Sequence, residues 1–298
     1  MNINEKNAHK RDALIEFEPG AHKYTCAGEG GYTSVTTWLH SHFKPFDADA
    51  IIKKMMSNPV KWKKSPYYGK TPDEIKAGWD QGRDEAAAAG TAMHQCIENF
   101  YLGDSNADLP PHFMDFVRDH PHLQPYRTEW MIFDEEVKIA GSIDMVVGGY
   151  PPDPPPGEIL YEGVAPPDPP GINSQQYGGI PPAINSSQDG GVGGIPPGVS
   201  PLVIYDWKRC KEIKQSNDFK EFASTECIKH LPDTNFWHYS LQLNIYKAIL
   251  ERKYDKKVAA MYLVCLHPSL SSYQLFPVPD LAEEVAALFA LRKTKLFQ

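Results

Sequence analysis

The sequence predicts an α/β fold in which a mixed central sheet is flanked by helices. Three observations predict it: helical patterns dominate residues 47–100, strand patterns follow over 126–147, and an apolar run at 202–208 suits a central strand that is covered on both faces. Because a further helix and a further strand follow this run, the order of elements is that of an α/β sandwich. With 298 residues, 41% of them hydrophobic, the chain can bury a substantial core, and we expect one domain.

The first forty residues predict a β-hairpin and a short helix. Alternating residues at 14–17 and 22–26 predict the two strands, and the glycine-rich stretch at 28–31 predicts a turn after them. Ser34 or Thr36 can then cap a helix.

Helical patterns fill the next segment, and they carry a local excess of positive charge. Asp47 is a suitable N-cap, and the alanines at 86–89 form a helix-forming run that leads into His94. Residues 53–76 contain seven lysines and two acidic residues, interleaved with tryptophan and tyrosine. This mixture is typical of a surface that guides a nucleic-acid strand, and equally of a solvated helix face over an aromatic core. The candidate contacts to DNA are Lys61, Trp62, Lys63, Lys64, Tyr67 and Tyr68.

The rest of the chain is predicted to hold two strands, a proline-rich insertion, and then a region in which strands and helices alternate. Residues 126–133 and 137–147 read as successive strands, whereas residues 151–201 hold 14 of the 27 prolines and near-repeats such as PPDPPPG and PPDPPG. We therefore expect a disordered Pro/Gly-rich insertion over 149–201. After the strand at 202–208 the patterns predict a helix over 236–252, a strand over 258–265 and a last helix capped by Asp280 with Glu283.

The strand at 202–208 presents two charged side chains on one face. Residues two apart in a strand point to the same side, so Asp206 and Lys208 project together while Trp207 points to the other side. If the strand around Asp144 lies alongside, it supplies a second carboxylate, and Gly141 allows a backbone or substrate to approach closely. Two carboxylates and a histidine form a hard, oxygen-rich ligand set that suits magnesium or manganese.

Each of these residues also has a plainer interpretation when it is taken alone. Asp206 and Lys208 can mark a strand end that reaches solvent, and His94, four residues before Glu98, can belong to an ordinary polar helix face. Glu129 by itself suits the surface of a strand. Only the order and spacing of all the motifs favour a functional site.

Taken together, the motifs resemble those of the RecB-like branch of the PD-(D/E)XK nucleases, which includes CRISPR-associated exonucleases and the mitochondrial genome maintenance exonuclease. The segment at 233–242 is similar to nucleases of phages and large DNA viruses. The resemblance runs from about His22 to the last helix, apart from the insertion. Its motifs are GTAMH at 90–94, Glu129, IAGSID at 139–144, DWK at 206–208 and QLNIY at 242–246.

The resemblance implies a restriction-endonuclease-like core and a metal-dependent deoxyribonuclease. We expect an exonuclease that acts on DNA ends or single strands in viral or phage replication, recombination or repair. A protein of this kind would be soluble and intracellular, in the host cytoplasm or nucleus if viral, and no apolar run approaches the roughly 20 residues that cross a membrane. The expected organisation is a DNA-guiding region over 1–85 and a nuclease core over 86–148 and 202–298.

The resemblance also implies roles for individual residues. One or two Mg²⁺ or Mn²⁺ ions would be bound by His94, Asp144, Asp206 and the backbone carbonyl of Trp207. Glu129 would either support these ligands from behind or help to bind a second ion. Lys208 would orient or deprotonate the attacking water, and Asp144 and Asp206 would share the catalytic site with it. A cation beside Lys208 lowers its pKa whereas the carboxylates raise it, so both protonation states of Lys208 stay open.

A polar stripe on the helix over 236–252 belongs to the same expected site. Gln242 and Tyr246 are four residues apart, and His238 extends the stripe by one turn. The resemblance implies that this helix faces the active site, where Gln242 and Tyr246 would position the lysine or the substrate strand, and we expect His238 to contact DNA. The alternative is that Tyr246 is simply an amphipathic core residue.

The cysteine spacing, the net charge and the composition of the insertion limit which cofactors and partners we expect. The five cysteines are scattered and form no C-x-x-C, so we expect reduced thiols, most of them buried, and neither a zinc ribbon nor an iron–sulfur cluster. The net charge of −8 argues against a passive DNA-coating protein but not against a site whose field is set by bound cations. The insertion has acidic residues but no Lys or Arg, so a phosphate backbone would repel it and we do not expect it to bind DNA. We expect it to act as a spacer or to bind a proline-reading partner.

Two other functions fit part of these observations. One is an endonuclease of the same fold, and the other is a catalytically inactive nucleic-acid-binding protein. Retention of mutually repelling carboxylates argues against an inactive site, because such acids are costly without a metal.

Overall fold

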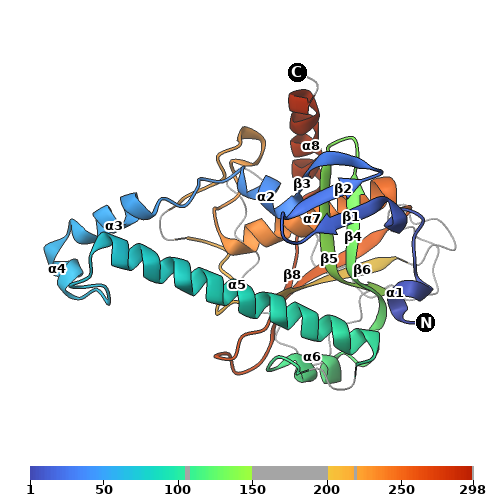
Figure 1. The fold of residues 1–298 in the computed structure, drawn as a ribbon, viewed down its shortest axis with the longest axis horizontal. Coiled ribbons are helices and arrows are strands. Elements are labelled where there is room, and N and C mark those ends of the chain that lie inside the picture. The colour runs from blue at the N-terminus through green and yellow to red at the C-terminus, as the bar shows by residue number, and fades with distance from the viewer. Residues whose placement is uncertain (105–107, 150–200, 218–219, 297–298) are drawn as a thin grey trace, which may run out of the picture.

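The computed structural model is an α/β fold in which a mixed, open central sheet is flanked by helices (Figure 1). The sequence-predicted insertion lies outside the described residues, apart from Gly149 and Pro201 at its two ends. The described residues are 1–104, 108–149, 201–217 and 220–296.

Eight strands form the sheet within the described part of the chain. Their order is β1–β2–β3–β5–β6–β7–β8, and β4 pairs with the remaining edge of β5. The strands are β1 (Ile15–Glu18), β2 (Lys23–Cys26), β3 (Glu29–Ser34), β4 (Gln124–Asp134), β5 (Ile139–Gly148), β6 (Leu202–Lys208), β7 (Val258–Cys265) and β8 (Gln274–Pro277).

Strand β5 is the centre of this arrangement. Antiparallel β4 pairs with it along its whole length, so its other edge is shared between β3 and β6. Strand β3 pairs there in parallel with Ile139 and Ala140, and antiparallel β6 pairs with residues 145–148. Strand β6 in turn pairs in parallel with β7, and the helix α7 lies between them in the chain.

The helices cover both faces of the sheet. Helices α2, α7 and α8 pack on one face, and α6 and the second half of α5 pack on the other (Figure 1). No helix in the described part of the chain is both long and apolar enough to cross a membrane. The helices are α1 (Ile3–Lys6), α2 (Val35–His40), α3 (Ala48–Met56), α4 (Pro59–Lys63), α5 (Pro72–Leu102), α6 (Phe113–Asp119), α7 (Asn235–Lys253) and α8 (Ala282–Leu296), with 3₁₀ turns at Asp12–Leu14 and Glu226–Ile228.

Strand β6 separates two hydrophobic cores, as its apolar run predicts. Leu202 and Ile204 belong to the core under α7, whereas Val203, Tyr205 and Trp207 belong to the core under α5 and α6. Side chains alternate along a strand, so Asp206 and Lys208 point towards α7 and Trp207 points away.

The N-terminal hairpin has a third strand that the sequence patterns did not predict. The turn between β2 and β3 consists of only two residues, Ala27 and Gly28, with φ angles of 51° and 77°. Two consecutive positive φ angles match the twist of antiparallel strands. The glycines at 30–31 therefore lie in β3, where a turn was expected.

Helices α3, α4 and the first half of α5 extend away from the sheet (Figure 1). We call these residues, 47–85, the arm. The Asp47 side chain caps α3, as predicted, and Thr71 with Glu74 forms a capping box at the start of α5. Ser34 caps α2, which confirms one of the two predicted caps.

The two described ends of the expected insertion adjoin each other. The Gly149 N–H donates to the Pro201 carbonyl at 3.0 Å, and Gly148 pairs with Leu202 across β5 and β6. The chain therefore leaves and re-enters the sheet at one point. This point is four residues along β5 from Asp144, roughly 13 Å at the usual rise of a strand.

Candidate metal centre

Strands β5 and β6 part where the predicted carboxylates lie. Their last backbone pair is Met145 with Tyr205. One residue further, the Asp144 side chain enters the gap, and its Oδ2 accepts a hydrogen bond from the Trp207 N–H at 2.9 Å. A carboxylate thus replaces the backbone partner of Trp207. The opening brings Asp144 next to the strand that carries Asp206 and Lys208.

The side chains of β5 change face at this point. Ile139 and Ile143 contribute to the core under α7, whereas Met145 and Val147 contribute to the core under α5. In a regular strand all four odd-numbered residues would share a face. The change of face falls at Asp144, whose carboxylate bonds to the Trp207 N–H in the gap between the two strands.

Glu129 lies opposite Asp144 on β4 and has a strained backbone. Its φ angle is 44°, in the left-handed region that costs a residue other than glycine about 1–2 kcal/mol. The Ser142 hydroxyl donates to Glu129 Oε2 at 3.0 Å and holds the carboxylate. Strain of this kind is concentrated at functional sites.

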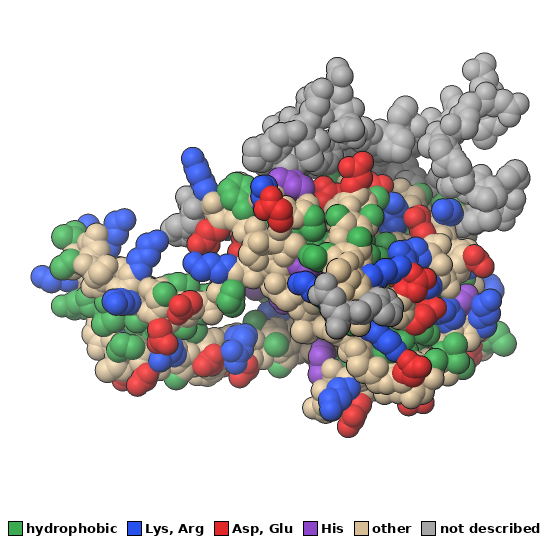
Figure 2. Space-filling model, turned by 90° about the horizontal axis from the view of Figure 1, so that it is seen from above, with side chains coloured by type: hydrophobic (Ala, Val, Ile, Leu, Met, Phe, Trp, Pro, Cys, Tyr) green, Lys and Arg blue, Asp and Glu red, His purple; other side chains and the backbone are tan. Residues whose placement is uncertain are grey.

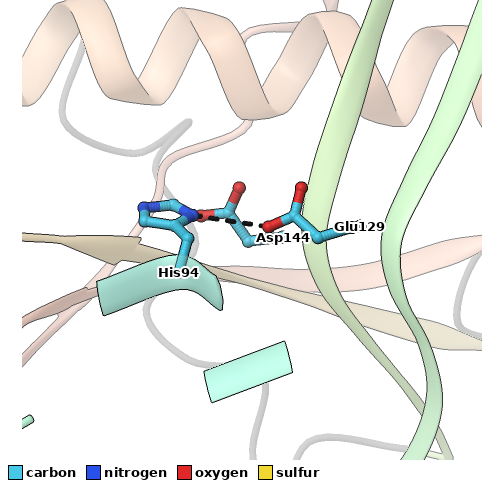
Figure 3. Close-up of side chains that lie close together, drawn as sticks. All are labelled: His94, Glu129 and Asp144. Carbon is cyan, nitrogen blue, oxygen red and sulfur yellow. Dashed lines mark ion pairs between the residues drawn. The ribbon is translucent and has the colours of Figure 1, made fainter. Parts of the chain in front are cut away.

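His94 on α5 faces both carboxylates. Its Nδ1 lies 3.5 Å from Glu129 Oε1 and 3.5 Å from Asp144 Oδ2, and Figure 3 shows the three side chains converging. A carbonyl oxygen only accepts, so the 3.0 Å contact between His94 Nε2 and Trp207 O requires the proton on Nε2. In the neutral ring, Nδ1 then has a free lone pair that faces Glu129 and Asp144, as a metal-ligating histidine needs.

The spacing of these atoms suits one cation. The ligand atoms of His94, Glu129 and Asp144 all lie within 4.8 Å of one another. An oxygen-ligated ion at about 2.0–2.6 Å from each ligand places two ligands at most about 5 Å apart. The donor set, two carboxylates and an imidazole, is compatible with magnesium or manganese.

The pKa values show that these carboxylates repel one another. Burial, and after it the charge of Asp206, raises the pKa of Asp144 to about 7. Burial opposes a charge on His94, but Asp144, Glu129 and Asp206 outweigh it and raise the pKa of His94 to about 9. The negative potential of the site therefore favours bound cations. Without a metal ion, His94 and Asp144 hold protons more tightly instead.

Asp206 and Lys208 form the second part of the site. Lys208 Nζ lies 2.6 Å from Asp206 Oδ2 in a buried ion pair, and 3.4 Å from Gln242 Oε1. Burial lowers the pKa of Lys208, but the charges of Asp206 and Asp144 overcome it and raise that pKa. The structure thus places Asp206 beside the group of three ligands, with its carboxylate engaged by the lysine.

Helix α7 supports Lys208 through Gln242. The Gln242 side chain accepts from Lys208 and donates to the Tyr246 hydroxyl at 3.2 Å. The Tyr246 ring is buried and packs against Gly141, where an added Cβ would lie 2.8 Å from Tyr246 Cε1. Tyr246 is therefore a core residue, and it also holds Gln242.

Tyr239, which the sequence patterns missed, covers Lys208. Lys208 Nζ lies 4.4 Å from the centre of its ring. His238 lies elsewhere: its Nε2 contacts Asp233 at 2.9 Å and its ring packs on Phe43. At about 100° per residue, Tyr239 lies about 20° from Tyr246 around the helix and His238 about 80°, so the spacing of three and a half residues per turn could have found Tyr239.

The predicted DNA contacts on α4 and the following loop all lie on the arm. Lysines and hydrophobic side chains gather over this part of the molecule (Figure 2). Tyr68 is 56% exposed and lies edge-on to Trp62. The Tyr67 hydroxyl, in contrast, accepts from the Trp79 indole N–H at 2.9 Å, so Tyr67 helps to hold the arm together. Exposed lysines at 61, 63 and 64 flank the aromatic pair.

Comparison with family models and with curated proteins identifies no relative of this chain. Its function therefore has to be inferred from the geometry and the charge of the site itself.

Proposed function

We propose that this chain is a magnesium- or manganese-dependent DNA exonuclease with a PD-(D/E)XK core of the RecB-like branch. The observation that carries the proposal is the Trp207 peptide group, whose N–H donates to Asp144 and whose carbonyl accepts from His94. This group ties the acid–x–lysine strand to the second carboxylate and to the histidine. The order of the sequence motifs supports the same proposal.

His94, Glu129 and Asp144 would hold the cation, with Asp206 at its side. When bound, a divalent ion would act as a Lewis acid and bring the pKa of a water from roughly 15.7 towards about 7. The mutual repulsion of the carboxylates supports this assignment, because a cation removes it without displacing any backbone. His94 would bind through Nδ1 while Trp207 keeps its ring in place.

Lys208 would act on the phosphate and the attacking water. Asp206 and Asp144 raise its pKa, so that Lys208 carries its proton and can donate hydrogen bonds. In the proposed reaction it orients the water and neutralises charge on the phosphate oxygens. Gln242 and Tyr239 hold the ammonium group in the position that this role needs.

The arm would guide the DNA strand towards this site. Its exposed lysines can contact phosphates, and exposed Tyr68 with the partly exposed Trp62 can stack on unpaired bases. Unpaired bases occur in single strands and at frayed ends, which are the substrates that an exonuclease attacks.

A cleavage assay tests the proposed function. Purified protein is incubated with end-labelled linear DNA and with closed circles, single- and double-stranded, in magnesium, manganese or chelator. We expect labelled ends to be released from linear DNA, circles to stay intact, and chelator to stop the reaction.

Variants show whether the assigned site is responsible. Asp206→Asn should lower cleavage at least about 100-fold, because the carboxylate beside Lys208 is lost. Asp12→Asn is the matched control: Asp12 is a half-buried acid bonded to Arg127 and Trp130, and its loss should leave cleavage by the folded protein unchanged. Nicked circles would indicate an endonuclease, and metal-dependent cleavage retained by Asp206→Asn would refute the site.

A further inference from the structure

Two cysteine side chains touch each other beside the lysine strand. Cys210 follows Lys208 by two residues, and Cys265 is the partner of Lys208 in the β6–β7 ladder. Their sulfur atoms are 3.3 Å apart, and the Cys265 thiol also contacts the Cys210 carbonyl at 2.9 Å. Both thiols are free. Two of the five cysteines are buried and three are partly buried, so the expectation that most are buried was wrong.

We propose that Cys210 and Cys265 are a modification site, in which a peroxide oxidises the pair to a disulfide that disturbs Lys208. Cys265 is fully buried, whereas Cys210 is partly exposed, so a small oxidant reaches Cys210 first. The effect on cleavage rests on the proposed function, but formation of the bond does not.

The reaction balances with hydrogen peroxide as the oxidant. The Cys210 sulfur attacks one peroxide oxygen, the O–O bond breaks, and a sulfenic acid and one water result. The Cys265 sulfur then displaces the sulfenic hydroxyl, which leaves as a second water, and the S–S bond forms. The two thiols lose two electrons and two protons, and the peroxide gains both.

The pair should react slowly. The hydrogen bond with Cys265, together with burial, raises the pKa of the Cys210 thiol, and the same bond lowers the pKa of Cys265, which is buried away from the oxidant. Because the thiolate is the reactive form, we expect oxidation over minutes to hours rather than seconds.

Bond formation should move the backbone next to Lys208. The sulfur atoms must approach from 3.3 Å to about 2.05 Å. The Cys265 thiol loses its proton, so it can no longer donate to the Cys210 carbonyl. The Leu266 N–H, which donates to the Lys208 carbonyl at 2.8 Å, lies next to the moving residue. Cys210, Cys265 and Tyr239 also pack in one core, so the cover over Lys208 shifts with them.

The test compares wild type, Cys210→Ser and Cys227→Ser before and after hydrogen peroxide, and again after dithiothreitol. Cys227 is partly buried and is the matched control. Mass spectrometry detects the linked peptides, amide exchange at Leu266 reports on the strand, and the cleavage assay reports on the site. In wild type and Cys227→Ser we expect the link, faster Leu266 exchange and cleavage at least about fivefold slower, all reversed by dithiothreitol. Cys210→Ser should show none of these changes.

Two results would overturn the proposal. One is the absence of a Cys210–Cys265 link under conditions that oxidise Cys227. The other is a link that leaves Leu266 exchange unchanged. If the protein cleaves no DNA at all, the proposed function fails, and the link and the Leu266 exchange still decide this inference.

Discussion

The two nitrogens of His94 serve different purposes. Nε2 donates to the Trp207 carbonyl and fixes the ring, which leaves Nδ1 facing Glu129 and Asp144. A histidine that is held through one nitrogen and presents the other is well suited to bind a metal. In the proposed metal site, this ligand geometry would exist before an ion binds.

Tyr239 provides a test of how Lys208 is held. Replacing it with leucine removes the aromatic face under the ammonium group, an interaction worth about 0.5–2 kcal/mol. We expect Tyr239→Leu to lower kcat about 3- to 20-fold, with a smaller effect on KM, because the lysine rather than the DNA is misplaced. Steady-state cleavage kinetics measure both constants.

Tyr239→Phe is the control for this change. Phenylalanine keeps the ring and removes only the hydroxyl, so its kcat should stay within about twofold of wild type. Equal losses in both variants would show that the ring face does not position the lysine.

His42 makes stability depend on pH away from the site. Burial, and after it the charges of Lys295 and Arg292, lowers its pKa from 6.5 to about 4. The unfolded chain therefore binds this proton at a higher pH than the folded chain does. The contribution of neutral His42 to the free energy of unfolding is therefore fully present above pH 6.5 and is lost as the pH falls through 4. At about 1.4 kcal/mol per pH unit, this contribution amounts to about 3 kcal/mol.

Urea unfolding between pH 7 and 4 checks this dependence. In His42→Gln the slope of the unfolding free energy against pH should become shallower over this range. His122→Gln, which replaces an exposed histidine, should keep the wild-type slope. An unchanged slope in His42→Gln would contradict the account.

The sequence predicted some of the site residues for clear physical reasons. Alternation along a strand places Asp206 and Lys208 on one face, and the structure does so. Alternation could not predict the left-handed backbone of Glu129 or the turned carboxylate of Asp144, because both depend on contacts between strands. Tyr239 was missed because a spacing of four residues was followed where the helix repeat is 3.6.

At the scale of elements, the gap between β5 and β6 creates the site. Two strands that stayed paired would satisfy the Trp207 N–H with a backbone carbonyl. Here the N–H bonds to Asp144 instead, so separation of the strands leaves no buried amide unpaired at Trp207. The fold can therefore open its sheet at one point without a large cost.

Close packing of α7 on β5 leaves little room for a side chain at Gly141. An added Cβ would lie 2.8 Å from Tyr246 Cε1, so the ring must move or the strand must bend. We expect Gly141→Ala to lower the free energy of unfolding by about 1–3 kcal/mol, as overpacking of a core does. At Gly148 on the same strand no described residue lies within 4 Å of an added Cβ, and Gly148→Ala should cost less than about 0.5 kcal/mol. Urea unfolding of both variants measures the difference, and equal losses would contradict this packing.

Long apolar patterns predicted elements well, and short elements were missed. Strands β6 and β7 have the predicted bounds because β7 is an uninterrupted run of apolar residues and β6 begins with four of them. Helix α6 has seven residues and depends on burial of Phe113 and Phe116 against the sheet, which no local pattern reveals. Strand β8 has four residues and pairs only with β7, so tertiary pairing rather than sequence specifies it.

At the scale of the whole molecule, charge is unevenly distributed. The chain carries a net charge of −8, yet residues 53–76 of the arm contain seven lysines and only two acidic residues, and the candidate metal centre gathers carboxylates. If the chain binds DNA as proposed, its negative charge would repel DNA over most of the surface, and the lysines at 53–76 would attract it. This arrangement favours binding in one orientation.

The arm makes a specific prediction about salt. Replacing Lys61, Lys63 and Lys64 with glutamate should weaken DNA binding and reduce the dependence of log Kd on log salt concentration by about 2–3. Fluorescence anisotropy with a short single strand, over a range of salt concentrations, measures this slope. Replacing three lysines outside the arm, Lys229, Lys256 and Lys257, provides the control; an unchanged slope in the arm variant would exclude the arm as a DNA surface.

The central claim is that His94, Glu129 and Asp144 hold a divalent cation. Calorimetric titration with manganese of wild type, Asp144→Asn and Asp12→Asn tests it most directly, because it needs neither DNA nor catalysis. The account predicts binding by wild type and Asp12→Asn, and affinity at least about tenfold lower in Asp144→Asn. Equal affinity in wild type and Asp144→Asn would contradict it.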